Sequence, residues 1–190
     1  MEKIATHDSC TGEKGHGFLS WLVTPFAKTQ SKTLQKQYDA GCKSFDIRVK
    51  KTKRGWVCAH GLWTTKRTFE DIITEIASFE DRCQVCITYE GNAEYSNELK
   101  ELCTRYRARF RHIIWGYVCI KYGKDSNGVK VKYSSTLIPS QPLFEGGTQG
   151  FIPLDGRSWH TYFPVPWLWN KLYTTPHKFN TETFTYVDFL

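Results

Sequence analysis

The chain has 190 residues, a formal net charge of +7 at pH 7 and an isoelectric point near 9.0. This length favours one domain spanning residues 1–190, and 40% hydrophobic with 24% charged residues excludes a low-complexity or fibrous chain. The basic charge predicts attraction to a polyanion. Because no zinc-finger or nucleic-acid-recognition spacing is present, we expect no nucleic-acid partner.

The cysteines and the N-terminus bear on location. Seven cysteines are an odd number, and the chain passes from Met-Glu-Lys into an apolar run without the features of a signal peptide. We therefore expect a cytoplasmic location, with secretion by another route or a viral origin as alternatives. Cys83 and Cys86 form a CxxC without a second pair, which indicates a structural role. No apolar run reaches the roughly 18 residues of a membrane span, so any lipid contact would be peripheral.

The first half of the chain predicts alternating strands and helices. We expect a strand over residues 3–6, a polar loop over 10–17, and a short helix over 18–23 closed by Pro25. A helix over 33–40 precedes Gly41, which stands where a C-cap is expected. Strands over 43–49 and 56–59 follow, separated by a basic turn over 50–55. Thr68, an acidic first turn and an apolar face predict a capped helix.

The second half begins regularly and then changes. Residues 84–89 are nearly continuously apolar, as in a strand covered on both faces, and Glu90 lies at its end. A helix over 96–110 and a strand over 113–115 complete an alternation that favours a parallel α/β sheet. Residues 117–122 and 129–133 flank Asn127-Gly128, which favours a hairpin. Residues 134–167 show no convincing helix, and residues 184–190 predict a last strand carrying Asp188.

Ionisable residues gather at the ends of the early apolar runs. Thr6-His7-Asp8-Ser9 ends the first run, Phe45-Asp46-Ile47-Arg48 ends the second, and Val57-Cys58-Ala59-His60 ends the third. Chemistry in parallel sheets is built at the carboxyl ends of the strands. Each fragment alone is typical of a cap or a solvated strand end. Together, in this order, they predict one acid–base and charge-stabilising site.

These fragments resemble the X-domain pattern of phosphatidylinositol-specific phospholipase C of the bacterial type. The resemblance also includes Thr29-Gln30-Ser31, residues 37–41, His60-Gly61 and residues 68–71, covers roughly the first half of the chain, and continues at Val187-Asp188-Phe189. It implies an α/β fold: an abbreviated, distorted TIM-type (β/α) barrel with a parallel sheet and an irregular second half. It also implies an enzyme, a phosphoric diester hydrolase or phosphorus–oxygen lyase, that cleaves a phosphoinositide-type phosphodiester.

The resemblance also implies residue roles. His7 would be the general base oriented by Asp188, and His60 the general acid with Asp8 beside it. Asp46 would hold Arg48, whose permanent charge clamps the phosphate. Imidazole suits acid and base work because it titrates near neutral pH. Adjacent His7 and Asp8 are expected to point to opposite sides of a strand or turn and need not pair with each other.

The same residues raise the question of a metal. In the calcium-dependent eukaryotic branch of this family an acidic residue stands where Arg48 stands, so Arg48 suggests that a fixed cation replaces the metal and that no cofactor is needed. Glu90 points the other way, because a glutamate there is a calcium ligand in that branch. Asp8, Asp46 and Glu90 form the alternative Ca²⁺ or Mg²⁺ site. In the metal-free interpretation Glu90 and Arg157 are candidates for substrate binding.

Two other functions stay open. One is a metal-dependent phosphodiesterase on the same barrel that acts on a glycerophosphodiester or a sphingolipid. The other is a non-catalytic module that binds head groups or glycans. A phospholipid or phosphorylated head group is the expected partner, a peripheral membrane surface could be a second, and the aromatic segment over residues 134–170 fits a lid, a core or a membrane contact. The sequence leaves the oligomeric state open.

Overall fold

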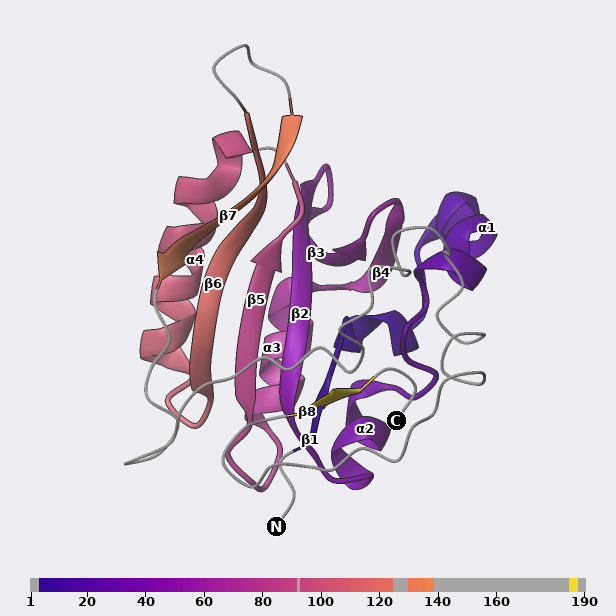
Figure 1. Ribbon diagram of the computed structural model, residues 1–190. Coiled ribbons are helices and arrows are strands. Elements are labelled where there is room, and N and C mark those ends of the chain that lie inside the picture. The colour runs from indigo at the N-terminus through magenta and orange to yellow at the C-terminus, as the bar shows by residue number, and fades with distance from the viewer. Residues whose placement is uncertain (1–3, 92, 125–129, 139–184, 188–190) are drawn as a thin grey trace.

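The computed structural model describes residues 4–91, 93–124, 130–138 and 185–187. Strands and helices alternate through most of this part of the chain, as Figure 1 shows. In order they are β1 (Ile4–Thr6), the 3₁₀ helix η1 (Ser9–Gly12), α1 (Gly17–Ala27), α2 (Leu34–Asp39), β2 (Cys42–Thr52), β3 (Gly55–His60), β4 (Trp63–Thr68), α3 (Phe69–Ala77), β5 (Gln84–Tyr89), the 3₁₀ helix η2 (Ala93–Tyr95), α4 (Ser96–Arg109), β6 (Ile114–Lys124), β7 (Lys130–Ile138) and β8 (Thr185–Val187).

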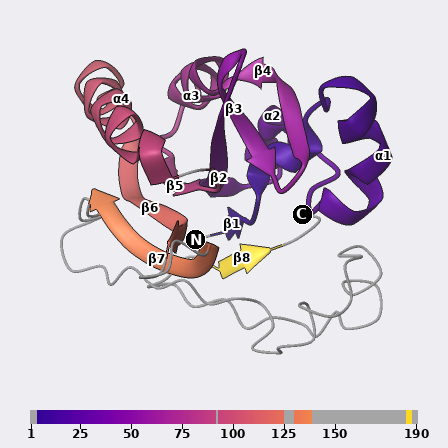
Figure 2. The ribbon, with the colours of Figure 1, turned by 90° about the horizontal axis from the view of Figure 1, so that it is seen from above.

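The strands form one curved, eight-stranded sheet (Figure 2). Five of them, in the order β8, β1, β2, β5 and β6, are parallel to their neighbours. β1 therefore lies beside β8, which confirms that the first and last expected strands are neighbours. Within the described residues the sheet is not closed, because β7 and β8 do not pair with each other.

Two hairpins depart from the predicted parallel sheet. β2 and β3 pair antiparallel, with Val49 opposite Cys58 and Thr52 opposite Gly55, and β4 continues the hairpin antiparallel to β3. Strand β4 was not predicted, because its sequence, Trp63-Thr-Thr-Lys-Arg-Thr, has two basic residues and little apolar character. β6 and β7 form the second hairpin, which the Asn-Gly signal predicted, although its turn lies outside the described residues. The prediction of a parallel barrel is therefore correct only for the five parallel strands.

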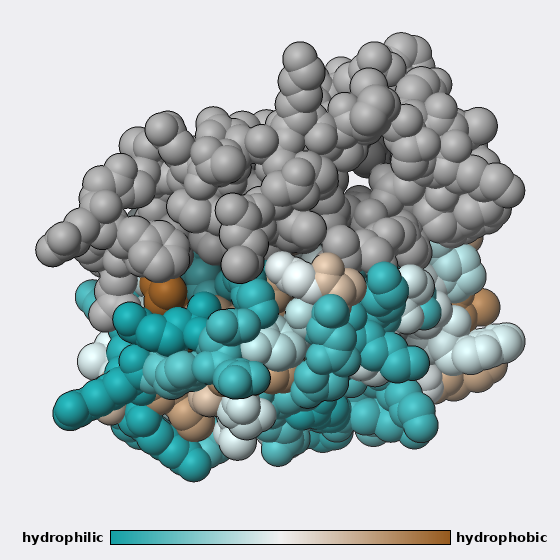
Figure 3. Space-filling view, turned by 90° about the horizontal axis from the view of Figure 1, so that it is seen from below, coloured by the Kyte–Doolittle hydropathy of each residue, from teal (hydrophilic) through white to brown (hydrophobic). Residues whose placement is uncertain are grey.

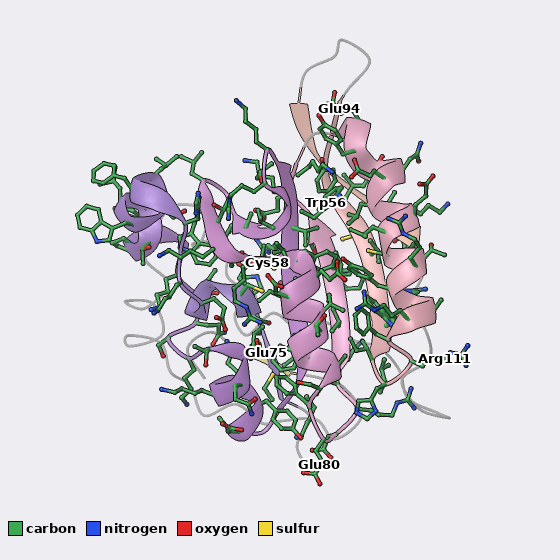
Figure 4. The ribbon with its side chains drawn as sticks, turned by 180° about the vertical axis from the view of Figure 1, so that it is seen from behind. Trp56, Cys58, Glu75, Glu80, Glu94 and Arg111 are labelled. Carbon is green, nitrogen blue, oxygen red and sulfur yellow. The ribbon has the colours of Figure 1, made fainter. Side chains whose placement is uncertain are left out.

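Alternation along the strands separates a helix-covered face from an inner face. Phe45, Ile47 and Val49 of β2 are buried in one apolar core with residues of α3 and α4. Figures 2 and 4 show these two helices together on one side of the sheet. Because successive strand residues point to opposite faces, Asp46 and Arg48 face the other side. The chain thus places its charged pair on the face away from the helices.

Several local signals are confirmed and some boundaries differ. Thr68 and Asp71 form a reciprocal capping box at the start of α3, with bonds of 3.1 and 2.8 Å. Gly41 has φ +96 and donates its N–H to the Tyr38 carbonyl, as a helix cap requires. Helix α1, however, continues past Pro25 to Ala27, because a proline so near the end removes only one backbone bond. The separate strands expected over 113–115 and 117–122 are the single strand β6.

The described surface is mostly hydrophilic on the face seen in Figure 3, where hydrophobic residues appear as separate patches. None of the helices described here has the length and apolar character that a membrane crossing requires.

Candidate active site

Two strands that pair with β2, the parallel β1 and the antiparallel β3, place their C-terminal residues at the site from opposite directions. β1 runs parallel to β2 and brings Thr6 opposite Phe45, while β3 runs antiparallel from Gly55 back toward the middle of β2. The register that places Cys58 opposite Val49 brings the end of β3 to the level of Ile47. The residues that follow β1 therefore meet His60 beside β2. Asp46 and Arg48 lie within β2 and not at its carboxyl end, because the hairpin lengthens that strand to Thr52.

Asp8 lies at the centre of the cluster. Its φ of 45 and ψ of 47 place it in the left-handed region, which aspartate tolerates better than most residues, and its side chain is 1% exposed. The backbone N–H of Asp8 lies 3.3 Å from Oδ2 of Asp46. Oδ1 of Asp8 forms a close ion pair with Nε of Arg48. The turn after β1 thus buries a carboxylate directly against a guanidinium.

Arg48 joins every other charged group of the site. Its Nη1 donates to Oε1 of Glu90 at 3.0 Å, its Nε lies 3.6 Å from Oδ2 of Asp46, and its Nη2 lies 2.5 Å from Nε2 of His7. A guanidinium only donates hydrogen bonds, so Nε2 of His7 must accept this one. The contact therefore favours the neutral form of His7, with an unprotonated nitrogen facing the cluster.

His7 is the most exposed member, with 40% of its side chain accessible. Its Nε2 lies 3.6 Å from Oδ2 of Asp8 and 3.8 Å from Oδ2 of Asp46. Its backbone is fixed from behind, because the His7 carbonyl accepts from the Thr29 hydroxyl at 3.0 Å and from the Gln30 amide at 3.1 Å. Both residues are buried. The ring is thus held by its backbone while it remains accessible.

His60 approaches the same carboxylate oxygen of Asp8 as His7 does. Its Nδ1 lies 2.7 Å from the carbonyl oxygen of Ala27 and 3.5 Å from Oδ2 of Asp8. A carbonyl only accepts, so Nδ1 carries a proton and Nε2 is the nitrogen left for a ligand. The next residue, Gly61, donates its N–H to Oε2 of Glu90 at 2.9 Å.

The charges of the site do not balance. Asp8, Asp46 and Glu90 are all buried, with side-chain exposures of 1, 6 and 3%, and Arg48 is the cation they share. Burial raises the pKa of Asp46, and the charge of Arg48 only partly opposes this effect. The same three carboxylates outweigh the burial of Arg48 and raise its pKa further, so it stays charged. Among these four groups, three carboxylates face one guanidinium.

The structure brings together six of the predicted site residues: His7, Asp8, Asp46, Arg48, His60 and Glu90. Asp188 and Arg157, and all but the first five residues of the segment 134–170, lie outside the described residues; those five belong to β7. One detail differs from expectation, since His7 and Asp8 point into the same cluster and their side chains approach within 3.6 Å. The left-handed turn at Asp8 causes this, because it removes the alternation that an extended strand would give.

Three supporting residues had no predicted role: Thr11, Thr29 and Gln30. The Thr11 hydroxyl donates to the Asp8 carbonyl at 2.9 Å and lies 2.9 Å from the Thr29 hydroxyl, so the three residues hold the His7–Asp8 backbone together. A sequence signal existed for two of them, because Thr29-Gln30-Ser31 belongs to the motif set. Their burial could not be read from such polar side chains.

The geometry bears on a metal ion. His7, Asp8 and Asp46 offer donor atoms that all lie within 4.8 Å of one another. Glu90 is not part of this group, and its two oxygens accept from Arg48 and Gly61 instead. The predicted alternative set of Asp8, Asp46 and Glu90 therefore fits a divalent cation poorly, because the Arg48 guanidinium lies among the three carboxylates.

Solved structures similar to this chain were found among bacterial enzymes. The phosphatidylinositol-specific phospholipase C from Listeria monocytogenes aligns with a TM-score of 0.57 over 99% of this chain and 88% of its own, at 17% sequence identity. This chain has the fold of the bacterial phosphatidylinositol-specific phospholipases C. A pentafluoro-Phe-incorporated phosphatidylinositol-specific phospholipase C from Staphylococcus aureus aligns with a TM-score of 0.52 over 98% of this chain and 85% of its own, at 13% identity.

The phospholipase C fold is recognised here through structure and not through overall sequence. No family model matches the sequence, and no curated protein matches it. At 13–17% identity the likeness to the phospholipases C concerns the fold. The chemistry of this chain must therefore be argued from its own side chains.

Proposed function

We propose that this chain is a phospholipase C-like phosphodiesterase that cleaves a phosphoinositide-type phosphodiester. One observation carries the proposal: two histidines approach the same buried carboxylate oxygen beside Arg48, with Nε2 of His7 at 3.6 Å and Nδ1 of His60 at 3.5 Å from Oδ2 of Asp8. Nε2 of His7 accepts from Arg48, whereas Nδ1 of His60 donates to the Ala27 carbonyl. A base, an acid and a fixed cation are the parts that an internal attack on phosphorus requires. The fold shared with bacterial phospholipases C supports the substrate class.

The proposed reaction transfers one proton from the substrate to His7 and one proton from His60 to the leaving group. His7 takes the proton of a head-group hydroxyl while that oxygen bonds to phosphorus. The bond from phosphorus to the diacylglycerol oxygen breaks, and His60 donates the proton that this oxygen receives. Nδ1 of His60 lies 3.5 Å from Oδ2 of Asp8, so this carboxylate faces the imidazole that would donate the proton. Asp188 as the partner of His7 remains a prediction from the sequence.

Arg48 would supply the positive charge for the phosphate. Its Nη2 now contacts His7, and a phosphate oxygen that took this donor would release the Nε2 lone pair of His7 for the substrate hydroxyl. Phosphate binding and activation of the base would therefore be linked. Charge-assisted bonds of this kind are stronger than neutral ones.

We propose further that the reaction needs no metal cofactor, because the Arg48 guanidinium occupies the position among the carboxylates that a divalent cation would take. The donor group of His7, Asp8 and Asp46 favours one alternative, a metal-dependent phosphodiesterase. Turnover measured with about 10 equivalents of EDTA distinguishes the metal-free reaction from the metal-dependent one. Full activity after chelation supports the fixed cation, and activity that returns only with Ca²⁺ or Mg²⁺ supports the alternative.

A lipid surface is the proposed partner, and α1 is the proposed contact. Helix α1 exposes Phe18 and Trp21 by 75 and 68%, together with Leu19, Leu22 and Phe26. The helix ends at Ala27, whose carbonyl contacts His60, so an apolar surface adjoins the site. Leu62, two residues beyond His60, is also exposed, by 61%. Aromatic side chains favour the membrane–water interface, and the net charge of +7 favours an anionic one.

The chemistry is tested by substitution of each histidine. His7→Ala and His60→Ala should each lower kcat for phosphatidylinositol by about 100-fold or more, with urea unfolding midpoints close to that of the native chain. His112→Ala is the matched control, because its ring contacts the Phe79 carbonyl outside the site. Phosphorus NMR should show a cyclic phosphodiester product. Turnover that persists in either site variant would exclude the mechanism.

The membrane contact has its own test. Phe18→Ser combined with Trp21→Ser should lower partitioning onto anionic phosphatidylinositol vesicles by at least about 30-fold, because burial of each aromatic ring contributes on the order of 1–3 kcal/mol and the two rings together at least about 2 kcal/mol. Turnover of a short-chain, monomeric substrate should stay unchanged. Equal loss on both substrates would assign α1 to the site itself and not to a membrane.

A further inference from the structure

Glu90 occupies a junction between three elements of the sheet. It directly follows β5, and its backbone N–H donates to the Val49 carbonyl at 3.0 Å, which continues the pairing of β2 with β5. Its side chain is 3% exposed. The Glu90 carboxylate is therefore buried on a backbone that is hydrogen-bonded into the sheet, and it can hold neighbouring hydrogen-bond donors in place.

The two oxygens of this carboxylate serve different parts of the site. Oε1 accepts from Nη1 of Arg48 at 3.0 Å, and Oε2 accepts from the backbone N–H of Gly61 at 2.9 Å. Gly61 has φ +60, so the turn after β3 depends on a residue that tolerates the left-handed region. His60 is the residue before it. One carboxylate therefore ties the phosphate-binding cation to the turn that carries the proposed acid.

From this geometry we infer that Glu90 is a positioning residue that sets the separation of Arg48 and His60, and not a group that contacts the substrate or a metal. The inference rests on the proposed function and deepens it. Both oxygens of Glu90 accept hydrogen bonds within the chain, and its side chain is only 3% exposed, so little of the carboxylate is accessible to a ligand or ion. Arg48 and His60 come from strands β2 and β3, whose hairpin alone does not hold a side chain in place.

The charge of Glu90 predicts an unusual kinetic signature. Glu90 adds a negative charge beside a site that must receive a phosphodiester anion, so it opposes phosphate binding while it improves the geometry of the reacting groups. Its removal should therefore slow the chemical step and strengthen the binding of anions. A residue that binds the head group gives the opposite pattern, a higher KM with little change in kcat.

The experiment compares Glu90→Gln and Glu90→Ala with Glu75→Gln in the full chain. Glu75 lies on helix α3, on the helix-covered side seen in Figure 4, and pairs with Arg67 of β4. It is therefore a matched control outside the site. We expect Glu90→Gln to lower kcat about tenfold and Glu90→Ala about 100-fold, since glutamine keeps one acceptor. KM should stay unchanged or fall, and inorganic phosphate should bind severalfold more tightly to both variants. The control should match the native chain.

A second measurement needs no turnover, and its first part uses the native chain alone. In the native chain the Gly61 amide proton should exchange slowly, whereas the Arg54 amide, in the exposed turn between β2 and β3, should exchange faster. In Glu90→Ala the Gly61 amide should lose this protection. If the native chain does not cleave phosphatidylinositol, the proposed function fails, while phosphate binding and Gly61 exchange still decide the role of Glu90.

Three results would overturn the inference. The first is a rise in KM with kcat unchanged, which would assign Glu90 to the substrate. The second is weaker phosphate binding in Glu90→Gln, which would make Glu90 part of an anion or metal site. The third is an unprotected Gly61 amide in the native chain, which would mean that the bond to Glu90 does not restrain the turn.

Discussion

Replacement of Arg48 by methionine should destabilise the fold strongly, because it removes the cation that three buried carboxylates share. The Arg48 side chain is 13% exposed, and its partners Asp8, Asp46 and Glu90 are 1, 6 and 3% exposed. Methionine retains most of the apolar stem and removes the guanidinium, so the lost term is mainly electrostatic.

The magnitude follows from the number and burial of these contacts. At 3–4 Å and an effective dielectric constant near 20, each charge pair contributes on the order of 4 kcal/mol, most of which offsets the cost of burial. Removal of one partner from a buried network typically costs about 3–5 kcal/mol. With an m-value near 2 kcal/mol/M, the urea midpoint of Arg48→Met should fall by about 2 M.

The loss should depend on pH in a defined direction. Burial already raises the pKa of Asp46 above its usual 3.8, and Arg48 holds it down. Without Arg48 this pKa rises further, so the folded chain binds more protons than the unfolded chain between the two pKa values. Stability of the variant should therefore fall as pH rises through that interval, and the deficit should be larger at pH 8 than at pH 5.

The assay is urea unfolding followed by tryptophan fluorescence at pH 5 and pH 8, with Arg67→Met as the control. Arg67 also pairs with a glutamate, but its side chain is 34% exposed, and it should cost about 1 kcal/mol or less. A native midpoint for Arg48→Met at pH 8, or a larger deficit at pH 5, would refute the reasoning.

Three further outcomes are expected. Thr68→Ala should lose the capping box of α3 and about 1 kcal/mol of stability in thermal unfolding. The bonds from Thr68 lower the pKa of Asp71, so the stability that the capping box contributes should disappear as pH falls below 4. A stability deficit that is unchanged at pH 2 would contradict this prediction. Gly12→Ala should cost more than about 2 kcal/mol, because a Cβ there would lie 1.8 Å from the Lys32 carbonyl oxygen, and a native melting temperature would contradict this. Thr29→Val removes the hydroxyl that donates to the His7 carbonyl and should cost about 1–2 kcal/mol while it lowers kcat, whereas Thr104→Val on the exposed face of α4 should do neither.

The elements that the sequence predicted well are those with local physical signals. The cap at Thr68, the glycine after α2 and the period of α3 act within a few residues, so they can be read from neighbours in the chain. Strand β4 was missed because its polar residues give no such signal, and it forms through pairing with β3. The single strand β6 was divided because Gly116 interrupts its pattern, yet any Cβ there would meet the Cys86 sulfur.

The candidate site divides in the same way. Side-chain chemistry singled out His7, Asp8, Asp46, Arg48 and His60, because ionisable residues that end apolar runs need a reason to be there, and the resemblance to the phospholipase C pattern added Glu90. Their partners could not be predicted from the sequence. The left-handed turn that brings His7 and Asp8 together, and the reversal of β3 toward the middle of β2, both depend on pairing between distant segments.

The sequence by itself determined which groups can carry the chemistry, since residue type fixes charge, proton affinity and hydrogen-bonding capacity. Only the tertiary structure decided how these groups share their bonds. It placed Arg48 among three carboxylates, set Nε2 of His7 against Arg48 and Nδ1 of His60 against the Ala27 carbonyl, and turned Glu90 from a candidate ligand into a bridge between Arg48 and Gly61. The physical reason is that a buried polar atom must find its partners within about 3 Å, and strand register decides which atoms come that close.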